Sequence, residues 1–458
     1  MKLKAVVLFG AILLCALAAI NSEEWPGFSP LVTKESRRTL TLTESGGITA
    51  VDVHDGCRGS YHLQFITLEP GSLFLPVLLH TDMLFYVHTG RGTVTYISED
   101  ETDEIDVVRG DVCRLQHGTT FFVRSHGDPT REKLRVHAIF DKTGIDDPLG
   151  FSVSAYSNLG DMVRGFDEKV LQSGFGVSEE TIRGLKWVPT PPPIVPTTHE
   201  NETEKPNWKE GILEALLGVG GPTDVMNRKK TTKTKTYNFF KAKPDVANRN
   251  GWSTAVTHED LQALEGSNLA PFMVNLTRGS MMGPHWNPRA TEIAVVLQGQ
   301  GMVQMVCPSD PKGKVDDDFA CRNTKFKVEE GDAFVVPRFH PMTQVSYNND
   351  TFVFVGFSSM AGNNHPQFLA GRSSVLQALD PDVVAASFNA PNASTIEGLL
   401  ASQSDSIILA CTSCAEELER IMEEDIERRK EEEERKRAEE EAEKREEAAT
   451  KREEAEVR

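Results

Sequence analysis

The chain has 458 residues and a formal net charge of −19, with 68 acidic and 49 basic side chains. A single hydrophobic core rarely grows to this length, so we expect two domains and additional segments. The acidic excess argues against nucleic acid and anionic membranes as partners, because both repel a negatively charged surface.

Two lysines and an apolar run open the chain, in MKLKAVVLFGAILLCALAAINSEEW. The run is too short to span a bilayer, and small residues before Glu23 offer a cleavage point. We therefore predict a secretory signal peptide over residues 1–22. No later segment is apolar enough to span a bilayer, so no membrane partner is expected.

The first half contains short segments in which apolar and polar residues alternate. They are rich in Val, Phe and Thr and are separated by Gly or Asp turns, which is typical of antiparallel strands that close into a sandwich or barrel. A helical pattern follows in MVRGFDEKVLQSGF and SEETIRGL. These features predict an N-terminal domain over residues 35–185, a barrel followed by helices.

Residues 186–234 have a different composition. VPTPPPIVPTTHENETEKP is rich in proline and predicts an extended linker. NWKEGILEALLG follows it, with Asn207 as a candidate N-cap and Glu210 in the reciprocal position, so we expect a short helix there.

The second half repeats the first. GSLFLPVLLHTD begins at Gly71 and GSMMGPHWNPRATE begins at Gly279, and each copy continues to a Gly-x-Gly turn. VVRGDVCRLQHG and VEEGDAFVVPRFH then form a second matching pair of segments. The second copy is longer than the first between these two pairs of segments, and the loop between Cys307 and Cys321 accounts for nearly all of the extra length. We predict a second barrel domain over residues 235–395, again followed by helices.

Residues 412–458 form a charged tail of strong helix formers, with Glu and Lys or Arg repeatedly three or four positions apart. Leu418, Ile421, Met422 and Ile426 give a single apolar patch near its start. A coiled coil needs apolar positions over several heptads, so we expect a solvated single helix, with a short coiled-coil start as the alternative.

The second copy also carries residues that suit a metal ion. His285 and Asn287 are two apart, so in a strand they point to the same face, and Glu292 follows a turn that lets it reach the same point. Imidazole and carboxylate suit Mn, Fe, Cu or Zn, whereas Asn is a weak neutral ligand.

These segments resemble the cupin superfamily, whose first motif places two His, a Glu and flanking Gly at fixed spacing. The matching positions are Gly279, His285, Asn287, Glu292 and Gly299, with Asn in place of the second His. YNFFKAKPDVANRNGWS before the second copy and FLAGRSSVLQAL after it make the chain similar to vicilin-type seed storage globulins. The Glu/Arg-rich tail is similar to that of a subgroup of vicilin-like proteins. The resemblance implies an all-β fold of two tandem cupin (jelly-roll) barrels and a homotrimer. The long charged C-terminal helix predicted from the residues is an addition to that pattern.

The second cupin motif is less complete. Pro337 matches it, but the usual His position holds Met342, and His340 lies two positions early. If a metal is bound, it would be shared by His285 and His340, with Asn287 and Glu292 as weaker contacts, and Cu or Zn is favoured over Fe or Mn. The alternative is that these residues form a buried hydrogen-bonded cluster with Asn287. The first copy has Val77 and Leu79, Gln116 and Phe121 at the corresponding positions and is expected to hold no metal.

The resemblance implies a nutrient reservoir without enzymatic activity, carried by the secretory pathway to a protein storage vacuole or to the extracellular space. Two alternatives are a metal-dependent cupin oxidase or dioxygenase, and a cupin that binds a sugar or another small ligand. The fold alone does not separate these functions.

Secretion also gives meaning to the cysteines. We predict a disulfide between Cys307 and Cys321, and Cys57 with Cys113 is a further candidate pair.

A lone C-x-x-C motif lies at Cys411 and Cys414, where a local or intermolecular disulfide is favoured over a redox site. Four N-glycosylation sequons qualify in a secreted chain, at Asn201, Asn275, Asn349 and Asn392.

Overall fold

The computed structural model describes residues 29–54, 59–98, 101–127, 131–142, 154–197, 235–308, 323–360, 364–405 and 407–421, with separate residues up to 438. The predicted signal peptide and the short helix predicted within 186–234 lie outside these residues. Among the helices that are described, none is long and apolar enough to cross a bilayer.

The first barrel is built of antiparallel strands in two sheets. Its strands are β2 (Arg38–Thr43), β3 (Gly46–His54), β4 (Ser60–Leu68), β5 (Ser72–Leu79), β6 (Met83–Thr89), β7 (Arg91–Ser98), β8 (Glu101–Val108), β9 (Asp111–Leu115), β10 (Thr120–Ser125), β11 (Leu134–Asp141), β12 (Tyr156–Asn158), β13 (Ile194–Pro196) and β14 (Tyr237–Asn238). One sheet runs β14-β9-β6-β11-β4-β3-β2, and the other runs β12-β5-β10-β7-β8 with β13 also on β5. Apolar side chains from both sheets fill the space between them.

The second barrel has the same arrangement. Its strands are β1 (Leu31–Val32), β15 (Val246–Asn248), β16 (Gly251–Ala255), β17 (Leu269–Leu276), β18 (Ser280–Met282), β19 (His285–Trp286), β20 (Glu292–Gln298), β21 (Gln300–Met305), β22 (Thr324–Glu329), β23 (Ala333–Val336), β24 (Met342–Ser346), β25 (Phe352–Ser359), β26 (Gln367–Phe368) and β27 (Ile408–Ala410). One sheet runs β1-β23-β20-β25-β17-β16-β15, and the other runs β22-β21-β24-β18-β27 with β19 on β24 and β26.

The two strand orders confirm the predicted duplication. Gly71 and Gly279 directly precede the equivalent strands β5 and β18, with φ of 73° and 62°. Gly90 and Gly299, in the Gly-x-Gly turns, have φ of 76° and 75°. Glycine adopts this left-handed conformation without the steric cost of a Cβ, so the shared glycines mark the same turns in both copies.

The barrels exchange strands reciprocally. Strand β1, from before the first barrel, pairs with β23 of the second, and β14, from the start of the second half, pairs with β9 of the first. The first barrel also takes up part of the predicted linker, because β13 pairs with β5. The predicted limits at residues 35, 186 and 235 therefore describe the chain order, while the spatial domains interleave.

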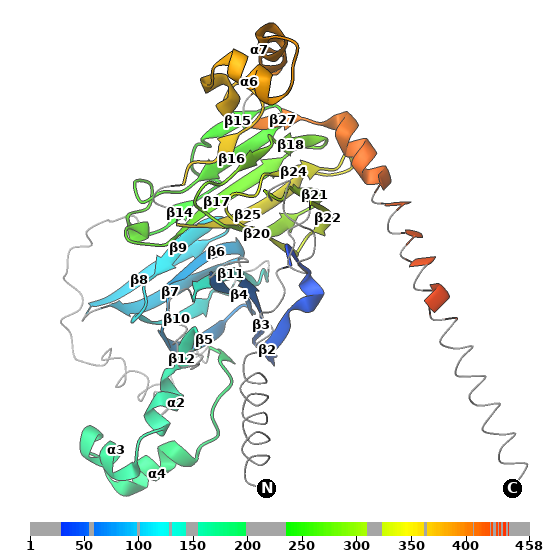
Figure 1. The fold of residues 1–458 in the computed structure, drawn as a ribbon. Helices are drawn as coiled ribbons and strands as arrows, with labels where there is room; N and C mark the ends of the chain where they lie inside the picture. Colours follow the sequence, from blue (N-terminus) through cyan, green and yellow to red (C-terminus); the bar gives the residue numbers. More distant parts are fainter. Residues whose placement is uncertain are drawn as a thin grey trace, which may run out of the picture.

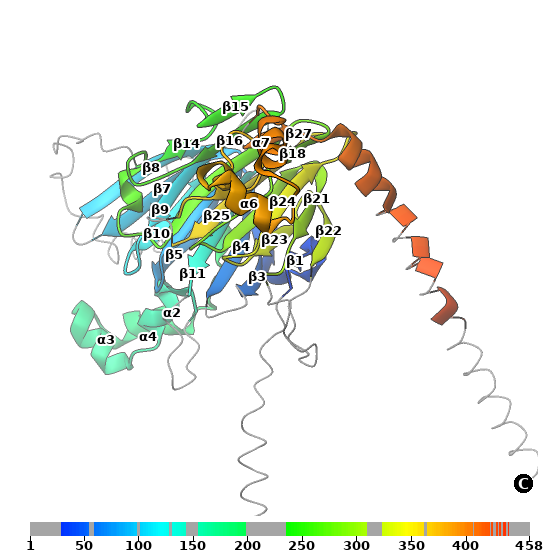
Figure 2. The same cartoon turned by 45° about the horizontal axis from the view of Figure 1, so that its top comes forward.

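The sheet that contains β6 and the sheet that contains β20 pack against each other through a hydrophobic core between the barrels. This inter-barrel core includes Tyr61, Phe65, Leu84, Tyr86, Val112 and Ile139 from the first barrel and Ile293, Val295, Val335, Val353, Val355 and Phe357 from the second. Figures 1 and 2 show the strands of both barrels as one continuous β body.

Short helices follow each barrel, as predicted. They are α2 (Leu159–Arg164), α3 (Glu168–Phe175) and α4 (Glu179–Trp187) after the first, and the 3-10 helix η5 (Val375–Ala378), α6 (Pro381–Ser387) and α7 (Ala393–Ala401) after the second. Each of these helices begins at a side chain that accepts a backbone hydrogen bond, namely Asn158, Asp167, Ser178, Ser374, Asp380 and Asn392. The two helical segments lie at opposite ends of the β body (Figure 1).

The chain after the second helical segment returns to the barrel. Strand β27 pairs with β18, and Cys411 and Cys414 directly after it form a local disulfide. The described residues from 412 to 438 are helical, and Leu418 packs beside this disulfide. The rest of the helix predicted over 412–458 lies outside the described residues.

The remaining cysteines are only partly described. Cys113 is a buried free thiol, so the pairing considered with Cys57 is not formed, and Cys57 itself lies outside the described residues. Cys307 takes part in a disulfide. Its predicted partner Cys321 lies outside the described residues, so that pairing stays a prediction.

Candidate functional site

The candidate site lies inside the second barrel, where polar side chains interrupt an otherwise apolar interior. The interior contains Val296, Val303, Phe334, Phe352, Phe354 and Ile408, all nearly inaccessible to solvent. His285, Asn287 and Glu292 are also buried, with 3%, 2% and 5% of their surface exposed. The face that His285 and Asn287 were predicted to share is therefore buried, and Glu292 is buried with it.

Glu292 is held by neutral amides. Its Oε2 accepts a hydrogen bond from Asn287 Nδ2 at 3.2 Å, and its Oε1 accepts one from Gln344 Nε2 at 3.1 Å. Asn287 is positioned in turn by Asn364, whose Nδ2 donates to Asn287 Oδ1 at 2.9 Å. Burial raises the pKa of Glu292 to about 7, since water no longer solvates the carboxylate.

His285 is a neutral imidazole in this environment. Its Nδ1 lies 2.8 Å from the carbonyl oxygen of Gly283, so Nδ1 carries the proton and donates it. The ring stacks on Phe368 with 5.1 Å between centroids. Burial lowers the pKa of His285 to about 4, because the charged form would lose its hydration.

Met342 occupies the position across from His285. The two residues are direct partners in the pairing of β19 with β24, so their side chains share a face of the sheet. The Met342 thioether accepts a hydrogen bond from Gln344 Nε2 at 3.4 Å. The usual cupin His position therefore holds a sulfur atom, as the sequence indicated.

His340 lies in the turn between β23 and β24. It is half-buried, and its Nδ1 is 3.1 Å from the Arg338 carbonyl oxygen. Within the described ranges, no three His, Cys, Asp or Glu side chains gather in an arrangement able to hold a metal ion. The structure thus joins Asn287 to Glu292, but it does not place His285, Glu292 and His340 in one such group.

Sequence reasoning missed two members of the site. Gln344 lies two residues after Met342, so the strand period alone would have placed it on the same face. Its Oε1 is buried and has no hydrogen-bond partner among the described residues. Asn364 is 77 residues away from Asn287 in an irregular segment, and no local pattern announces it.

The first barrel is filled at the corresponding positions. Val77, Leu79 and Phe121 are each at most 2% exposed and belong to its apolar interior.

That barrel also holds a chain of polar contacts that the sequence did not reveal. His62 lies 2.7 Å from Asp52 and 3.0 Å from Gln64, and Tyr156 donates to Gln64 at 3.0 Å. Each member has a partner, so this chain needs no ligand to satisfy it.

The sequons differ in accessibility. Asn349 and Asn392 are exposed, and Asn275 is half-buried within β17. Asn201 lies outside the described residues. Glycosylation of all four stays a prediction.

Comparison with known proteins identifies the family to which this chain belongs. A cupin family model matches residues 237–394. A vicilin-like seed storage protein of Arabidopsis thaliana is 40% identical over 448 residues, which cover 92% of this chain and 84% of the relative. The chain belongs to the vicilin-like seed storage proteins. A second Arabidopsis thaliana protein of this description is 46% identical over 428 residues, covering 88% of the chain but 57% of that relative's length.

Solved vicilins share the fold. The hazelnut (Corylus avellana) vicilin is 20% identical with a TM-score of 0.65, covering 83% of this chain and 99% of its own. The Capsicum annuum vicilin is 20% identical with a TM-score of 0.66, again covering 83% of this chain and 99% of its own. The vicilin-like double barrel predicted from the duplicated motifs is therefore confirmed.

Proposed function

We propose that this vicilin-like protein is a nutrient reservoir of seeds, delivered through the secretory pathway to the storage vacuole. The family membership carries the proposal, and the filled barrel interiors support it. We expect no turnover, since the donors of the candidate site are already committed to one another by hydrogen bonds.

The protein's abundance over the life of a seed tests the reservoir function. An antibody against the chain should detect accumulation during seed maturation and disappearance during germination, while a metabolic enzyme measured in the same extracts remains. A constant level through germination, or absence from mature seeds, would contradict a storage role.

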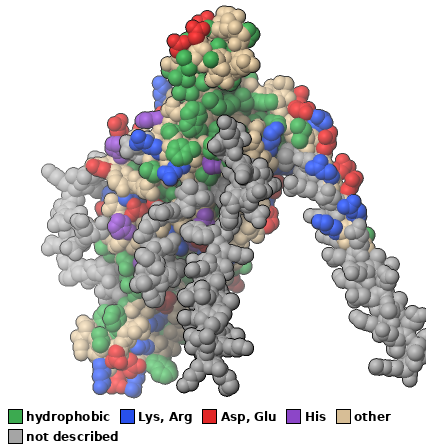
Figure 3. Space-filling model, in the orientation of Figure 1, with side chains coloured by type: hydrophobic (Ala, Val, Ile, Leu, Met, Phe, Trp, Pro, Cys, Tyr) green, Lys and Arg blue, Asp and Glu red, His purple; other side chains and the backbone are tan. Residues whose placement is uncertain are grey.

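We infer that the chain assembles as a closed homotrimer through its two helical segments. Phe166, Val170 and Trp187 of the first segment are 57%, 54% and 80% exposed, and Val383 and Phe388 of the second are 63% and 58% exposed. Hydrophobic side chains are visible on both segments in Figure 3. Two different apolar surfaces at opposite ends suit head-to-tail contacts that close into a ring.

Mass photometry of the purified chain distinguishes the assembly states. Wild-type protein should appear as a trimer, and Val170→Glu or Val383→Glu should give folded monomers, because a charge would be buried in each contact. Leu42→Glu, at an 82% exposed Leu outside both helical segments, is the matched control and should leave the trimer intact. A trimer that survives both helical variants would overturn this assembly.

We also infer a weak metal site in the second barrel, of copper or zinc. Glu292 is a buried carboxyl with neutral partners, and a divalent cation would compensate its charge. His285 and Met342 face each other in register, and imidazole with thioether favours copper over zinc.

Elemental analysis of protein purified without chelator tests this site. We expect no more than a single copper or zinc ion per chain, lost in His285→Ala and retained in the control His258→Ala, whose His is exposed. Metal-free wild-type protein would contradict the site.

Anions are disfavoured in the same barrel. A Solanum melongena vicilin, 22% identical with a TM-score of 0.64, is described as holding different anionic ligands in structurally similar pockets. In this chain an anion beside the site would face Glu292, which is negatively charged above its pKa of about 7, so a cation or a neutral ligand suits the site better there.

A further inference from the structure

Two histidines of the first barrel stack on each other at the face that meets the second barrel. His88 on β6 and His137 on β11 have ring centroids 5.0 Å apart and ring planes 25° apart. His137 contacts Phe65 edge-on at 5.1 Å, and Tyr86 lies 6.3 Å from it. Phe65 and Tyr86 belong to the inter-barrel core, so the imidazole pair lies at the edge of that core.

Neither imidazole is fully satisfied by hydrogen bonds. The Nδ1 atoms of His88 and His137 are buried and have no partner in the described part of the chain. A neutral imidazole tolerates this arrangement because its rings pack on aromatic neighbours. An imidazolium would bring a buried N–H donor and a positive charge with no acceptor beside it.

The charged groups that act on the pair are themselves basic. The positive charges of Arg135 and Arg109 lower the pKa of His88, and those of Arg37 and Arg135 lower the pKa of His137. Arg37 comes from the segment before β2, and its guanidinium lies over the Phe65 ring while donating to the Gly331 carbonyl of the second barrel.

Two carboxylates also act at this place. The negative charges of Asp332 and Glu35 raise the pKa of Arg37, so they compensate the charge of its guanidinium rather than that of the imidazoles. The pair thus combines an aromatic contact, unpaired ring nitrogens and cationic neighbours at a contact between two domains.

We propose that His88 and His137 form an acid-sensitive joint between the two barrels. When both rings are neutral, they extend the inter-barrel core. When acid protonates them, two positive charges appear beside Arg37 and Arg135, and the contact between the barrels loosens. A drop in pH would then open this storage protein at its domain contact before the barrels themselves unfold.

The direction of the pH dependence follows from burial. Desolvation lowers the pKa of His88 from 6.5 to about 4 and lowers that of His137 as well. A histidine whose pKa falls on folding contributes its full stability above about pH 6.5, and that stability is lost as pH falls toward the folded pKa. Each such histidine increases the unfolding constant by up to about tenfold per pH unit in this window.

Denaturant unfolding of the full chain between pH 7.5 and 4.5 tests the joint. The variant His88→Phe/His137→Phe keeps the aromatic contacts without a titrating nitrogen, and His258→Phe, at an exposed His, is the matched control. We expect the stability of wild type and control to fall steeply below about pH 6.5. In the double variant, the unfolding constant should rise by up to about tenfold less for each histidine and each pH unit.

Small-angle scattering at pH 4 without denaturant reports on the barrel contact itself. Wild-type protein should expand while keeping its β circular dichroism, and the double variant should not. If the double variant fails to fold, proton uptake on unfolding at pH 5.5 replaces it as the test. The proposal requires that the wild-type protein takes up protons and that His88→Gln and His137→Gln each reduce this uptake. An unchanged acid slope in the double variant, or no expansion of wild type, would overturn the proposal.

Discussion

At the scale of single residues, Phe339 has a backbone conformation that favours glycine. Its φ is 69°, a left-handed conformation that L side chains adopt at a cost, and its ring is 53% exposed. Its backbone N–H donates to the Asn287 carbonyl at 2.9 Å, so this strained turn supports the candidate site. The strain is therefore retained beside buried polar residues.

Replacing Phe339 by Asn should stabilise the protein by about 1 kcal/mol, because Asn tolerates the left-handed region. Phe339→Ala removes the same ring without relieving the backbone and is the control. Urea unfolding at neutral pH measures both variants. Equal stabilities of the Asn and Ala variants would show that the backbone conformation carries no cost here.

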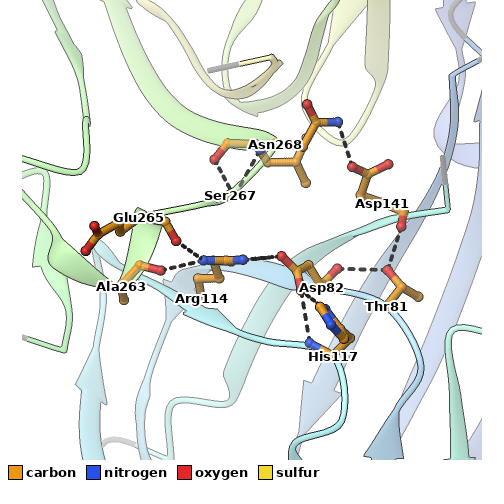
Figure 4. A network of polar contacts seen from close by, with 10 residues as sticks. Thr81, Asp82, Arg114, His117, Asp141, Ala263, Glu265, Ser267 and Asn268 are labelled. Atoms are coloured by element: carbon orange, nitrogen blue, oxygen red, sulfur yellow. Dashed lines mark hydrogen bonds and ion pairs between the residues drawn. The ribbon is translucent and has the colours of Figure 1, made fainter. Parts of the chain in front are cut away.

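Arg114 is another residue with more than a local role (Figure 4). Its Nε donates to Asp82 Oδ2 at 3.0 Å within the first barrel. Its Nη1 donates to the carbonyl oxygens of Ala263 at 2.9 Å and Glu265 at 2.8 Å, at the end of the 3-10 helix η3 (Gln262–Leu264) of the second half. A buried guanidinium thus connects the two barrels.

Arg114→Ala should cost about 3 kcal/mol of stability, because it leaves Asp82 and two carbonyls without their buried donor. Arg38→Ala is the matched control, since Arg38 is 59% exposed and pairs with Asp52 at 3.0 Å. A surface pair of that kind contributes about 0–1 kcal/mol. Thermal or urea unfolding measures the difference, and similar losses in both variants would contradict a coupling role for Arg114.

At the scale of elements, the hairpins depend on glycines that admit a close backbone approach. A Cβ on Gly299 would meet the Thr351 carbonyl oxygen at 1.8 Å, and one on Gly90 would meet the Lys133 carbonyl oxygen at 2.5 Å. The turns between β6 and β7 and between β20 and β21 therefore exclude side chains for two reasons, the positive φ and the lack of space.

Comparing Gly299→Ala with Gly118→Ala separates the cost of the positive φ from the cost of the missing space. Gly118 has φ of +79°, and a Cβ added there would meet nothing within 4 Å, so its variant should lose only the conformational cost of about 1–2 kcal/mol. Gly299→Ala should lose a further 1–3 kcal/mol or so from overlap with the strand. Unfolding of both variants at one pH measures the difference between their free energies of unfolding. Equal losses would mean that the strand next to Gly299 shifts without cost to make room for the Cβ.

The start of the tail is an element with two attachments. Glu419 Oε1 accepts from the Asn348 backbone N–H at 2.9 Å, and Asn348 Nδ2 donates to the Thr412 carbonyl at 3.2 Å. Arg420 pairs with Glu417 and Glu424 on the helix surface, at the spacing that predicted a charged helix. In the described part of the tail, these attachments lie close to Leu418 and the apolar patch near its start.

At the scale of the whole molecule, the reciprocal exchange of β1 and β14 ties each half of the chain into the other barrel. The inter-barrel core and Asn268, which donates to Asp141 at 2.8 Å, strengthen the same contact. These contacts join described residues on both sides of the sequence 198–234, which itself lies outside the described residues.

Cutting the chain at a protease site placed within residues 198–234 should leave the two fragments together at neutral pH. Size-exclusion chromatography of the cut protein should show one particle, and denaturing electrophoresis should show two fragments. Deleting residues 29–33 from the cut protein removes β1 and should weaken the association. Fragments that separate at neutral pH without this deletion would contradict the interleaved arrangement.

Local pattern alone determined much of this protein. Alternating apolar residues with Gly turns predicted the barrels, the repeat at Gly71 and Gly279 predicted their equivalence, and the motif spacing placed Met342 in the usual His position. These features were predictable because strand period, turn geometry and register act over a few residues.

Contacts between distant segments were decided only by the tertiary structure. A two-residue strand such as β1 has no pattern that names its partner, and alternation does not say which apolar face meets the other barrel. The pairing of Asn364 with Asn287 and the stacking of His88 on His137 likewise depend on how the barrels close and pack. Such contacts join residues far apart in the chain, and their energies become available only once the backbone brings these residues together.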